Sequence, residues 1–138
     1  MRIRRLGREQ ALSLLFQVDV GGLPYARVLE VNEREREVPP EAWNFAVELT
    51  RGTLSHLAEI DRVINDLAID WTVDRMASMD RAILRLATYE LLYRPDIPPS
   101  VSINEAVELA KRYGTEESSR FVNGILGHLA RRLEADGE

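Results

Sequence analysis

Apolar side chains recur every three or four residues along most of the chain, which is the spacing of a helix that buries one face. The first such stretch runs from about Leu6 to Val20 and ends at Gly21-Gly22. A short second helix is expected after Pro24. The charged stretch from Glu30 to Glu41 is predicted to be a solvated helix end and loop.

A longer periodic segment follows, from Glu41 to Leu67. As one helix it would be ~42 Å long, more than a small core needs, so a break is expected near His56 to Glu59. The segment from Ser78 to Tyr93 is apolar around most of its circumference, which is typical of a central helix with one exposed edge. That polar edge is formed by Arg81, Arg85 and Thr88.

The last two helices carry capping signals. Ser102-Ile103-Asn104-Glu105 has the form of a capping box, and the helix it begins is expected to end at Tyr113, with Gly114 as a left-handed stop. Thr115 is expected to cap the final helix. No alternation of period two, the signature of a strand, is present. The sequence therefore predicts an all-α fold, a compact helical bundle of six to seven helices, as one domain spanning residues 1–138.

Composition limits what such a bundle does. With 23 acidic and 18 basic side chains the net charge is −5, which argues against a protein that coats nucleic acid non-specifically. The absence of cysteine excludes a disulfide framework and a thiolate metal site. No run reaches the roughly 18 apolar residues of a membrane span. We expect a cytoplasmic protein without a metal or cofactor.

The arginines at the N-terminus stand out against this acidic background. Arg2, Arg4, Arg5 and Arg8 precede the first acid, Glu9. They predict a mobile basic arm over residues 1–8, in which Arg4 and Arg8 share a helical face and could follow nucleic-acid phosphates. A merely solvated N-terminus is the alternative.

A second candidate for nucleic-acid contact spans residues 117–123. Arg120, Phe121 and Asn123 lie within four residues of one another and could stack on and pair with unstacked RNA bases. Packing in the core is the alternative for Phe121. Gly124 weakens a helix, and its expected use is a close approach between helices.

Other side chains give weaker signals. His56 and His128 have no neighbouring acid at relay spacing, and Glu90 has no second acid or nucleophile, so an enzyme is disfavoured. A buried Glu90 is instead expected to cap a helix N-terminus or to meet an arginine. Three apolar side chains could either face a basic protein partner or close the core: Phe16, Trp71 and Met76.

Four segments in order resemble the NusB family of transcription antitermination factors over nearly the whole chain. They are Arg4-Arg5-Leu6-Gly7-Arg8-Glu9-Gln10-Ala11-Leu12, the stretch from Asp80 to Leu91, the stretch from Ile103 to Lys111, and Phe121-Val122-Asn123-Gly124-Ile125-Leu126. The resemblance implies an all-helical, non-enzymatic protein. It also implies that the chain pairs with the small-subunit ribosomal protein NusE and binds boxA RNA within the RNA polymerase antitermination complex, chiefly in ribosomal RNA operons.

The resemblance also implies roles for particular residues. RNA-binding positions carried over by motif are Arg4, Arg5, Arg8, Glu117, Arg120, Phe121 and Asn123. Positions that match the family's protein-partner interface are Phe16, Asp74 and Asp80. Gly7 stands where alanine is usual, which predicts a frayed arm, and Phe16 stands where many members have tyrosine. Some members form homodimers, and a protein-binding adaptor or homodimer without RNA binding is the alternative reading.

Overall fold

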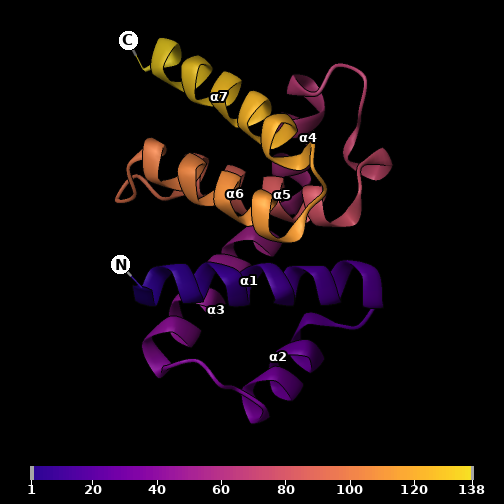
Figure 1. Ribbon diagram of the computed structural model, residues 1–138, viewed down its shortest axis with the longest axis vertical. Coiled ribbons are helices and arrows are strands. Elements are labelled where there is room, and N and C mark those ends of the chain that lie inside the picture. Colours follow the sequence, from indigo (N-terminus) through magenta and orange to yellow (C-terminus); the bar gives the residue numbers. More distant parts are fainter. Residues whose placement is uncertain (1, 138) are drawn as a thin grey trace. The chain divides into compact units, whose positions relative to one another are not determined.

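The computed structural model describes residues 2–137, and within that range it is built of helices joined by short connections (Figure 1). The elements are α1 (Arg2–Gly21), α2 (Tyr25–Arg34), α3 (Pro40–Ser55), α4 (Leu57–Leu67), the 3-10 turn η1 (Val73–Arg75), α5 (Ser78–Tyr93), α6 (Pro99–Tyr113) and α7 (Ser118–Asp136). Seven α-helices and no strand in the described part confirm the all-α fold class.

The chain divides into two compact units, and the boundary lies at the break predicted in the long periodic segment. The N-terminal unit ends at Ser55, the last residue of α3, and the C-terminal unit begins at His56, just before α4. The expected break near His56 is therefore confirmed.

In the N-terminal unit, α1 packs on both α2 and α3. Leu14, Val28 and Leu49 are fully buried, one from each helix. Polar contacts tie α2 to its neighbours: the Tyr25 and Thr50 hydroxyls share a hydrogen bond, and Trp43 Nε1 donates to Glu33 at 3.2 Å. Burial raises the pKa of Tyr25, because a phenolate would lose its hydration there.

The prediction of a mobile arm over residues 1–8 was wrong. α1 begins at Arg2 rather than near Leu6, so the arginines lie in regular helix. Gly7 explains the difference: a Cβ at this position would lie 2.8 Å from Phe45 Cδ2 and 3.0 Å from the Ala42 carbonyl oxygen. The glycine thus allows α3 to approach α1 closely, and that packing holds the helix that glycine was expected to fray.

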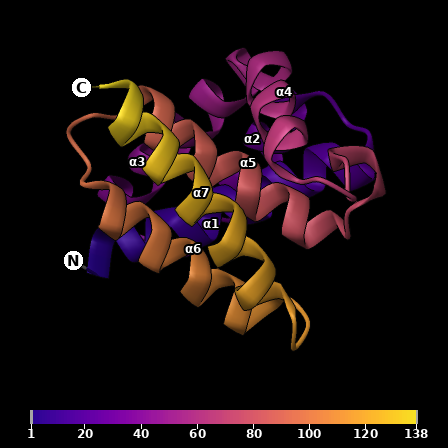
Figure 2. The ribbon, with the colours of Figure 1, turned by 90° about the horizontal axis from the view of Figure 1, so that it is seen from above.

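In the C-terminal unit, α5 contacts α4, α6 and α7, and α6 and α7 lie side by side in both views (Figure 2). The predicted bounds of α5 are confirmed, and Ile83 and Leu84 are fully buried. The predicted polar edge was wrong at Thr88, which is buried. Arg85 forms a two-pronged ion pair with Asp61, both contacts at 2.8 Å, which neutralises the half-buried cation.

The predicted capping box at Ser102 was wrong, because α6 begins three residues earlier. The helix begins at Pro99, because proline suits the first helical position, and Ser102 is already within the helix. The Ser102 hydroxyl donates to Glu90 Oε1 at 2.8 Å. A hydroxyl from the first turn of α6 therefore supplies a hydrogen-bond donor to buried Glu90.

The connection between α6 and α7 also differs from its prediction. Gly114 has φ −93°, so it is no left-handed stop; a Cβ there would lie 2.5 Å from the Ser118 side chain. Thr115 does not cap α7, which begins at Ser118. Instead, the Ser118 hydroxyl accepts from the Thr115 backbone N–H at 2.9 Å, and this folded-back contact requires glycine at 114.

Candidate nucleic-acid interface

The first two turns of α1 carry the arginines of the N-terminal unit. Arg2, Arg4 and Arg5 are exposed, whereas Arg8 is 3% exposed. The positive end of the helix dipole adds to their field, and no acidic residue lies in the first turn of α1. This end of α1 is therefore suited to bind an anion.

One aromatic ring orders two of these arginines. The guanidinium carbons of Arg4 and Arg8 lie 4.7 Å and 5.4 Å from the centroid of the Phe45 ring. Arg4 and Arg8 thus share a helical face, as predicted. That face packs against Phe45 of α3 and is not wholly exposed to solvent. Arg8 acts chiefly in packing, while Arg4 is both held and exposed.

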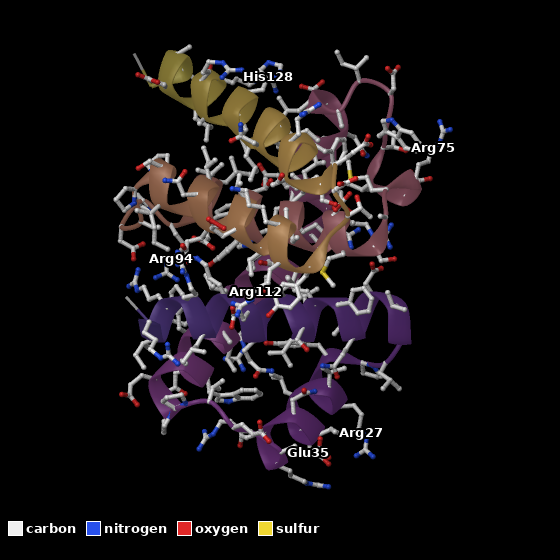
Figure 3. The ribbon with its side chains drawn as sticks, viewed as in Figure 1. Arg27, Glu35, Arg75, Arg94, Arg112 and His128 are labelled. Atoms are coloured by element: carbon white, nitrogen blue, oxygen red, sulfur yellow. The ribbon has the colours of Figure 1, made fainter. Side chains whose placement is uncertain are left out.

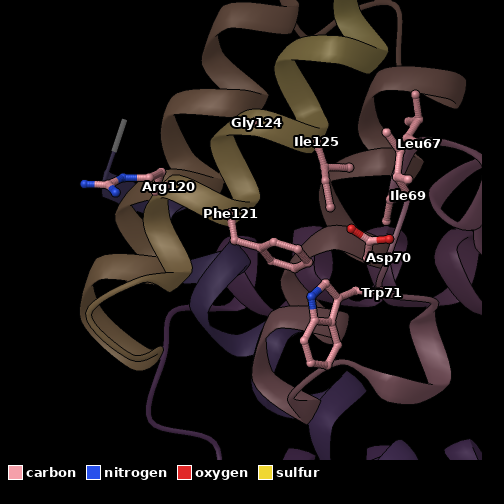
Figure 4. A pocket seen from close by; sticks show the side chains of 9 residues that line it. Leu67, Ile69, Asp70, Trp71, Arg120, Phe121, Gly124 and Ile125 are labelled. Carbon is pink, nitrogen blue, oxygen red and sulfur yellow. The ribbon is translucent and has the colours of Figure 1, made fainter.

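In the C-terminal unit, the start of α7 presents a second group of predicted residues. Arg120 and Asn123 are exposed and Phe121 is half-buried. The Phe121 ring points toward Trp71, and the Arg120 side chain extends away from it (Figure 4). Figure 3 shows these helices with all described side chains in place. Phe121 therefore packs partly in the core and is partly exposed at the surface.

Two grooves meet at this aromatic pair. The α4–α7 groove has a volume of about 330 Å³ and is lined by Leu67, Ala68, Ile69, Asp70, Trp71, Arg120, Phe121, Gly124 and Ile125. The α5–α7 groove has a volume of about 350 Å³ and is lined by Trp71, Arg75, Met76, Ala77, Asp80, Thr115, Glu117, Ser118 and Phe121. Trp71 and Phe121 line both grooves.

The α4–α7 groove is predominantly apolar. Ile69 is 91% exposed and Trp71 52% exposed, although both are large apolar side chains. Gly124 has no atom within 4 Å of where its Cβ would lie. The prediction that Gly124 permits close packing of helices was therefore wrong, because no atom of residues 2–137 fills the space beside it.

The α5–α7 groove carries carboxylates. Asp80 Oδ1 is buried without a hydrogen-bond partner within residues 2–137, and Glu117 lies at the start of α7. Arg75 covers Trp71 from this side, 5.5 Å from the ring centroid. An unpaired carboxylate oxygen beside apolar surface is suited to a donor from a basic partner.

Asp74 lies nearby in η1 and is fully exposed. A hydrogen bond from the Thr72 hydroxyl holds the pKa of this carboxyl below its ordinary value. Asp74 therefore stays ionised at neutral pH and presents a fixed negative charge next to the α5–α7 groove.

The structure brings some predicted residues together and leaves others apart. Glu117, Arg120, Phe121 and Asp80 gather at the two grooves, whereas Arg4, Arg5, Arg8 and Phe16 belong to the N-terminal unit. Asn123 is exposed on α7 but lines neither groove. Met76 is buried and closes the core, which settles one of the open alternatives.

Sequence reasoning missed Ile69 and Gly124 as groove residues and left Trp71 ambiguous. The available signal was the presence of Ile69 and Trp71 on either side of Asp70, in a connection without helical periodicity. Large apolar side chains in such a connection have no helical face on which to be buried. For Gly124, only the open space around it in the structure distinguishes its role.

His56 and Tyr93 have structural contacts in the C-terminal unit. The His56 ring stacks on Tyr93 with centroids 4.0 Å apart, and Tyr93 donates a hydrogen bond to Glu59 at 2.6 Å. That hydrogen bond raises the pKa of Tyr93. Within residues 2–137, no three His, Cys, Asp or Glu side chains are grouped to hold a metal ion. None of the helices in that range combines the length and the apolar character of a membrane span.

Comparison with known proteins identifies relatives of nearly the whole chain. The NusB family model matches residues 5–131. The transcription antitermination protein NusB of Pelotomaculum thermopropionicum is 50% identical over 131 residues, which cover 95% of this chain and 91% of that protein.

Solved structures agree. The structure of T. maritima NusB superposes with a TM-score of 0.83 at 40% identity, covering 93% of this chain and 90% of that one. A chain in the crystal structure of antitermination factors NusB and NusE in complex with dsRNA gives a TM-score of 0.85 at 28% identity, covering 96% and 98%. This chain belongs to the NusB family.

Proposed function

We propose that this chain is a transcription antitermination factor that binds boxA RNA together with the small-subunit ribosomal protein NusE. In this role it promotes processive transcription of ribosomal RNA operons as part of the RNA polymerase antitermination complex in the cytoplasm. Its contribution is assembly rather than catalysis. The observation that carries the proposal is the likeness over nearly the whole chain to a protein solved together with NusE and dsRNA.

The charge distribution supports an RNA-binding role despite the net charge of −5. The exposed Arg4 and Arg5 at the positive end of α1 would bind phosphates, with Arg8 and Phe45 ordering the segment. Glu117, Arg120, Phe121 and Asn123 form the second region that would face RNA. Electrostatic capture by arginines would be followed by contacts with bases.

The acidic surface supports a basic partner. Asp74 is ionised and exposed, and Asp80 Oδ1 lacks a donor among the described residues. Together with Phe16 of α1, these residues would contact NusE. Because the chain is acidic overall, it would bind RNA weakly alone and more tightly once a basic protein shares the RNA.

Electrophoretic shift titrations of boxA RNA test the proposal. The chain alone, NusE alone and the two together are titrated at one salt concentration. We expect the mixture to bind more tightly than either protein alone. An RNA of the same length and scrambled sequence serves as the matched control, and the mixture should bind it less tightly. Equal affinity with and without NusE would contradict the cooperative step.

A protein-binding adaptor or homodimer without RNA binding is the second candidate. The exposed apolar side chains of Ile69 and Trp71 favour it, because such surface is typical of protein contacts. It predicts that partner binding survives replacement of Arg4, Arg5 and Arg8 by alanine and that no RNA is retained at any salt concentration.

A further inference from the structure

We propose that the α4–α7 groove is a slot for one unpaired RNA base, with Trp71 and Phe121 as aromatic walls and Gly124 at its helix side (Figure 4). The inference rests on the proposed function, since that function makes RNA the ligand. The inference specifies where a base would be held, and it adds Asp70 and Trp71, from the connection between α4 and η1, to the residues that would hold it.

The two aromatic walls are available to a flat ligand. Trp71 is 52% exposed, and Phe121 points toward it across the groove. Arg75, which lies over the Trp71 ring, lines the α5–α7 groove and not the α4–α7 groove. The side of Trp71 that faces the α4–α7 groove is therefore not covered by that cation. Aromatic rings of this kind stack on any unpaired base, whatever its sequence.

Gly124 makes room for a close approach to the backbone of α7. It is exposed in mid-helix, no atom lies within 4 Å of its missing Cβ, and its φ is not in the left-handed region. Neither packing nor backbone conformation requires glycine there, and glycine weakens a helix. The remaining use of such a residue is to let a ligand come close to the backbone.

The charges around the groove fit a nucleotide with its base inside and its phosphate outside. Arg120 lies at the rim and extends away from the groove, where a phosphate would run. Asp70 lines the groove, and as a carboxylate it accepts hydrogen bonds only. It would accept from an exocyclic amino group, which adenine, cytosine and guanine have and uracil lacks.

The neighbouring groove shows why a base is favoured here over a side chain of a basic protein. Asp80 lines the α5–α7 groove, and its buried Oδ1, which has no hydrogen-bond partner within residues 2–137, would attract such a side chain. The α4–α7 groove has Asp70 as its one carboxylate residue, balanced by Arg120, and is otherwise apolar. The two grooves thus present different chemistry on the two sides of Trp71 and Phe121.

Tryptophan fluorescence tests the slot directly. The chain has two tryptophans, and Trp43 is 3% exposed, so a ligand that stacks on tryptophan can reach Trp71 and not Trp43. The complex with NusE is titrated with single-stranded boxA RNA and with the same RNA annealed to its complement. We expect the single strand to quench the emission of Trp71, the duplex to quench it much less, and the Trp71→Phe variant to lose the response. Trp71→Ala should weaken single-strand binding by about 5- to 150-fold, the effect of one stacked base.

A second variant fills the slot without removing a core residue. Gly124→Leu should weaken single-strand binding as Trp71→Ala does, while thermal unfolding shows the fold intact, because leucine favours helix more than glycine does. His128→Leu is the matched control, since His128 is exposed one turn further along α7 and lines neither groove. It should bind RNA normally.

Two results would overturn the slot and leave the proposed function standing. One is tight RNA binding with unchanged Trp71 emission and no effect of Gly124→Leu. The other is quenching by NusE alone, with Gly124→Leu weakening NusE binding and not RNA binding, which would make the groove a protein contact. Absence of RNA binding by wild-type chain with NusE would overturn the proposed function itself, and the slot with it.

Discussion

Gly7 in α1 and Gly124 in α7 are both glycines within a helix, yet their surroundings differ. At Gly7 the place of a Cβ is occupied, with Phe45 2.8 Å away, while at Gly124 nothing lies within 4 Å. The first glycine serves the packing of its own chain, and the second leaves space that the chain does not use. Residue type alone does not distinguish the two, but the surroundings do.

The arginines repeat this contrast. Arg8 is buried on the Phe45 ring, whereas Arg120 extends from the start of α7 into solvent. The arginine segment of α1 is therefore preordered by its own unit, and the α7 region is open and incomplete. We infer that substitutions at the packed positions of the first region, such as Gly7 and Phe45, change stability, while those in the second region change binding with little cost in stability.

The largest effect on stability is expected from Gly7→Val. The added side chain meets Phe45 and the Ala42 backbone, and overpacking of this kind costs about 1–3 kcal/mol. Urea unfolding measures it. Gly124→Val is the matched control, because it has the same chemistry in open space. Equal stability of the two variants would refute the contrast between the glycines.

Phe45→Leu should have the next largest effect. Leucine keeps the apolar contact but removes the ring beneath Arg4 and Arg8, where each cation–π contact contributes about 0.5–1 kcal/mol. Hydrogen exchange of the first turn of α1 should accelerate along with the loss of stability. Phe121→Leu, the control in the open region, should leave that exchange unchanged. If the α1 amides exchange no faster in Phe45→Leu, the ring does not order the segment.

Gly124→Ala should raise the free energy of unfolding by up to about 1 kcal/mol, because alanine favours helix and the methyl group meets no neighbour. Thermal unfolding measures the gain. Gly7→Ala, by comparison, should gain less or lose stability because of the contact with Phe45. A destabilised Gly124→Ala would mean that α7 packs more tightly here than the structure has it.

The smallest effect concerns Asp74. Its pKa lies below its ordinary value of 3.8, chiefly because the Thr72 hydroxyl donates to the carboxylate. A lowered pKa in the folded state contributes stability above pH 3.8, and that contribution is lost as the pH falls through the folded-state pKa. Thr72→Val should raise the pKa of Asp74 toward 3.8 in an NMR titration, while Thr115→Val should leave it unchanged. No change in Thr72→Val would assign the shift to another cause.

Much of the fold followed from periodicity. The bounds of α5 and the break at His56 were predicted because long apolar patterns and chain length constrain them strongly. Local caps were predicted poorly. Pro99 began α6 earlier than the capping box at Ser102, whose hydroxyl is instead directed to Glu90, a partner 12 residues away in sequence that no local pattern identifies.

The candidate site was predictable in its residue types and not in its geometry. Arg120 and Phe121 were found as neighbours in sequence, but Trp71 and Ile69 come from a connection that only the folded unit brings to the same groove. The arm was predicted to be frayed because Gly7 disfavours helix, and tertiary packing on Phe45 overrode that propensity.

The salt dependence of boxA RNA binding, measured with NusE present, tests most directly the claim that both regions contact the same RNA. We expect Arg4→Ala with Arg5→Ala to lower the slope of log affinity against log salt, and Arg120→Ala to lower it as well, by about one unit for each lost phosphate contact. The combined variant should show the sum of the two changes. A slope altered by substitutions in only one of the two regions would contradict the account.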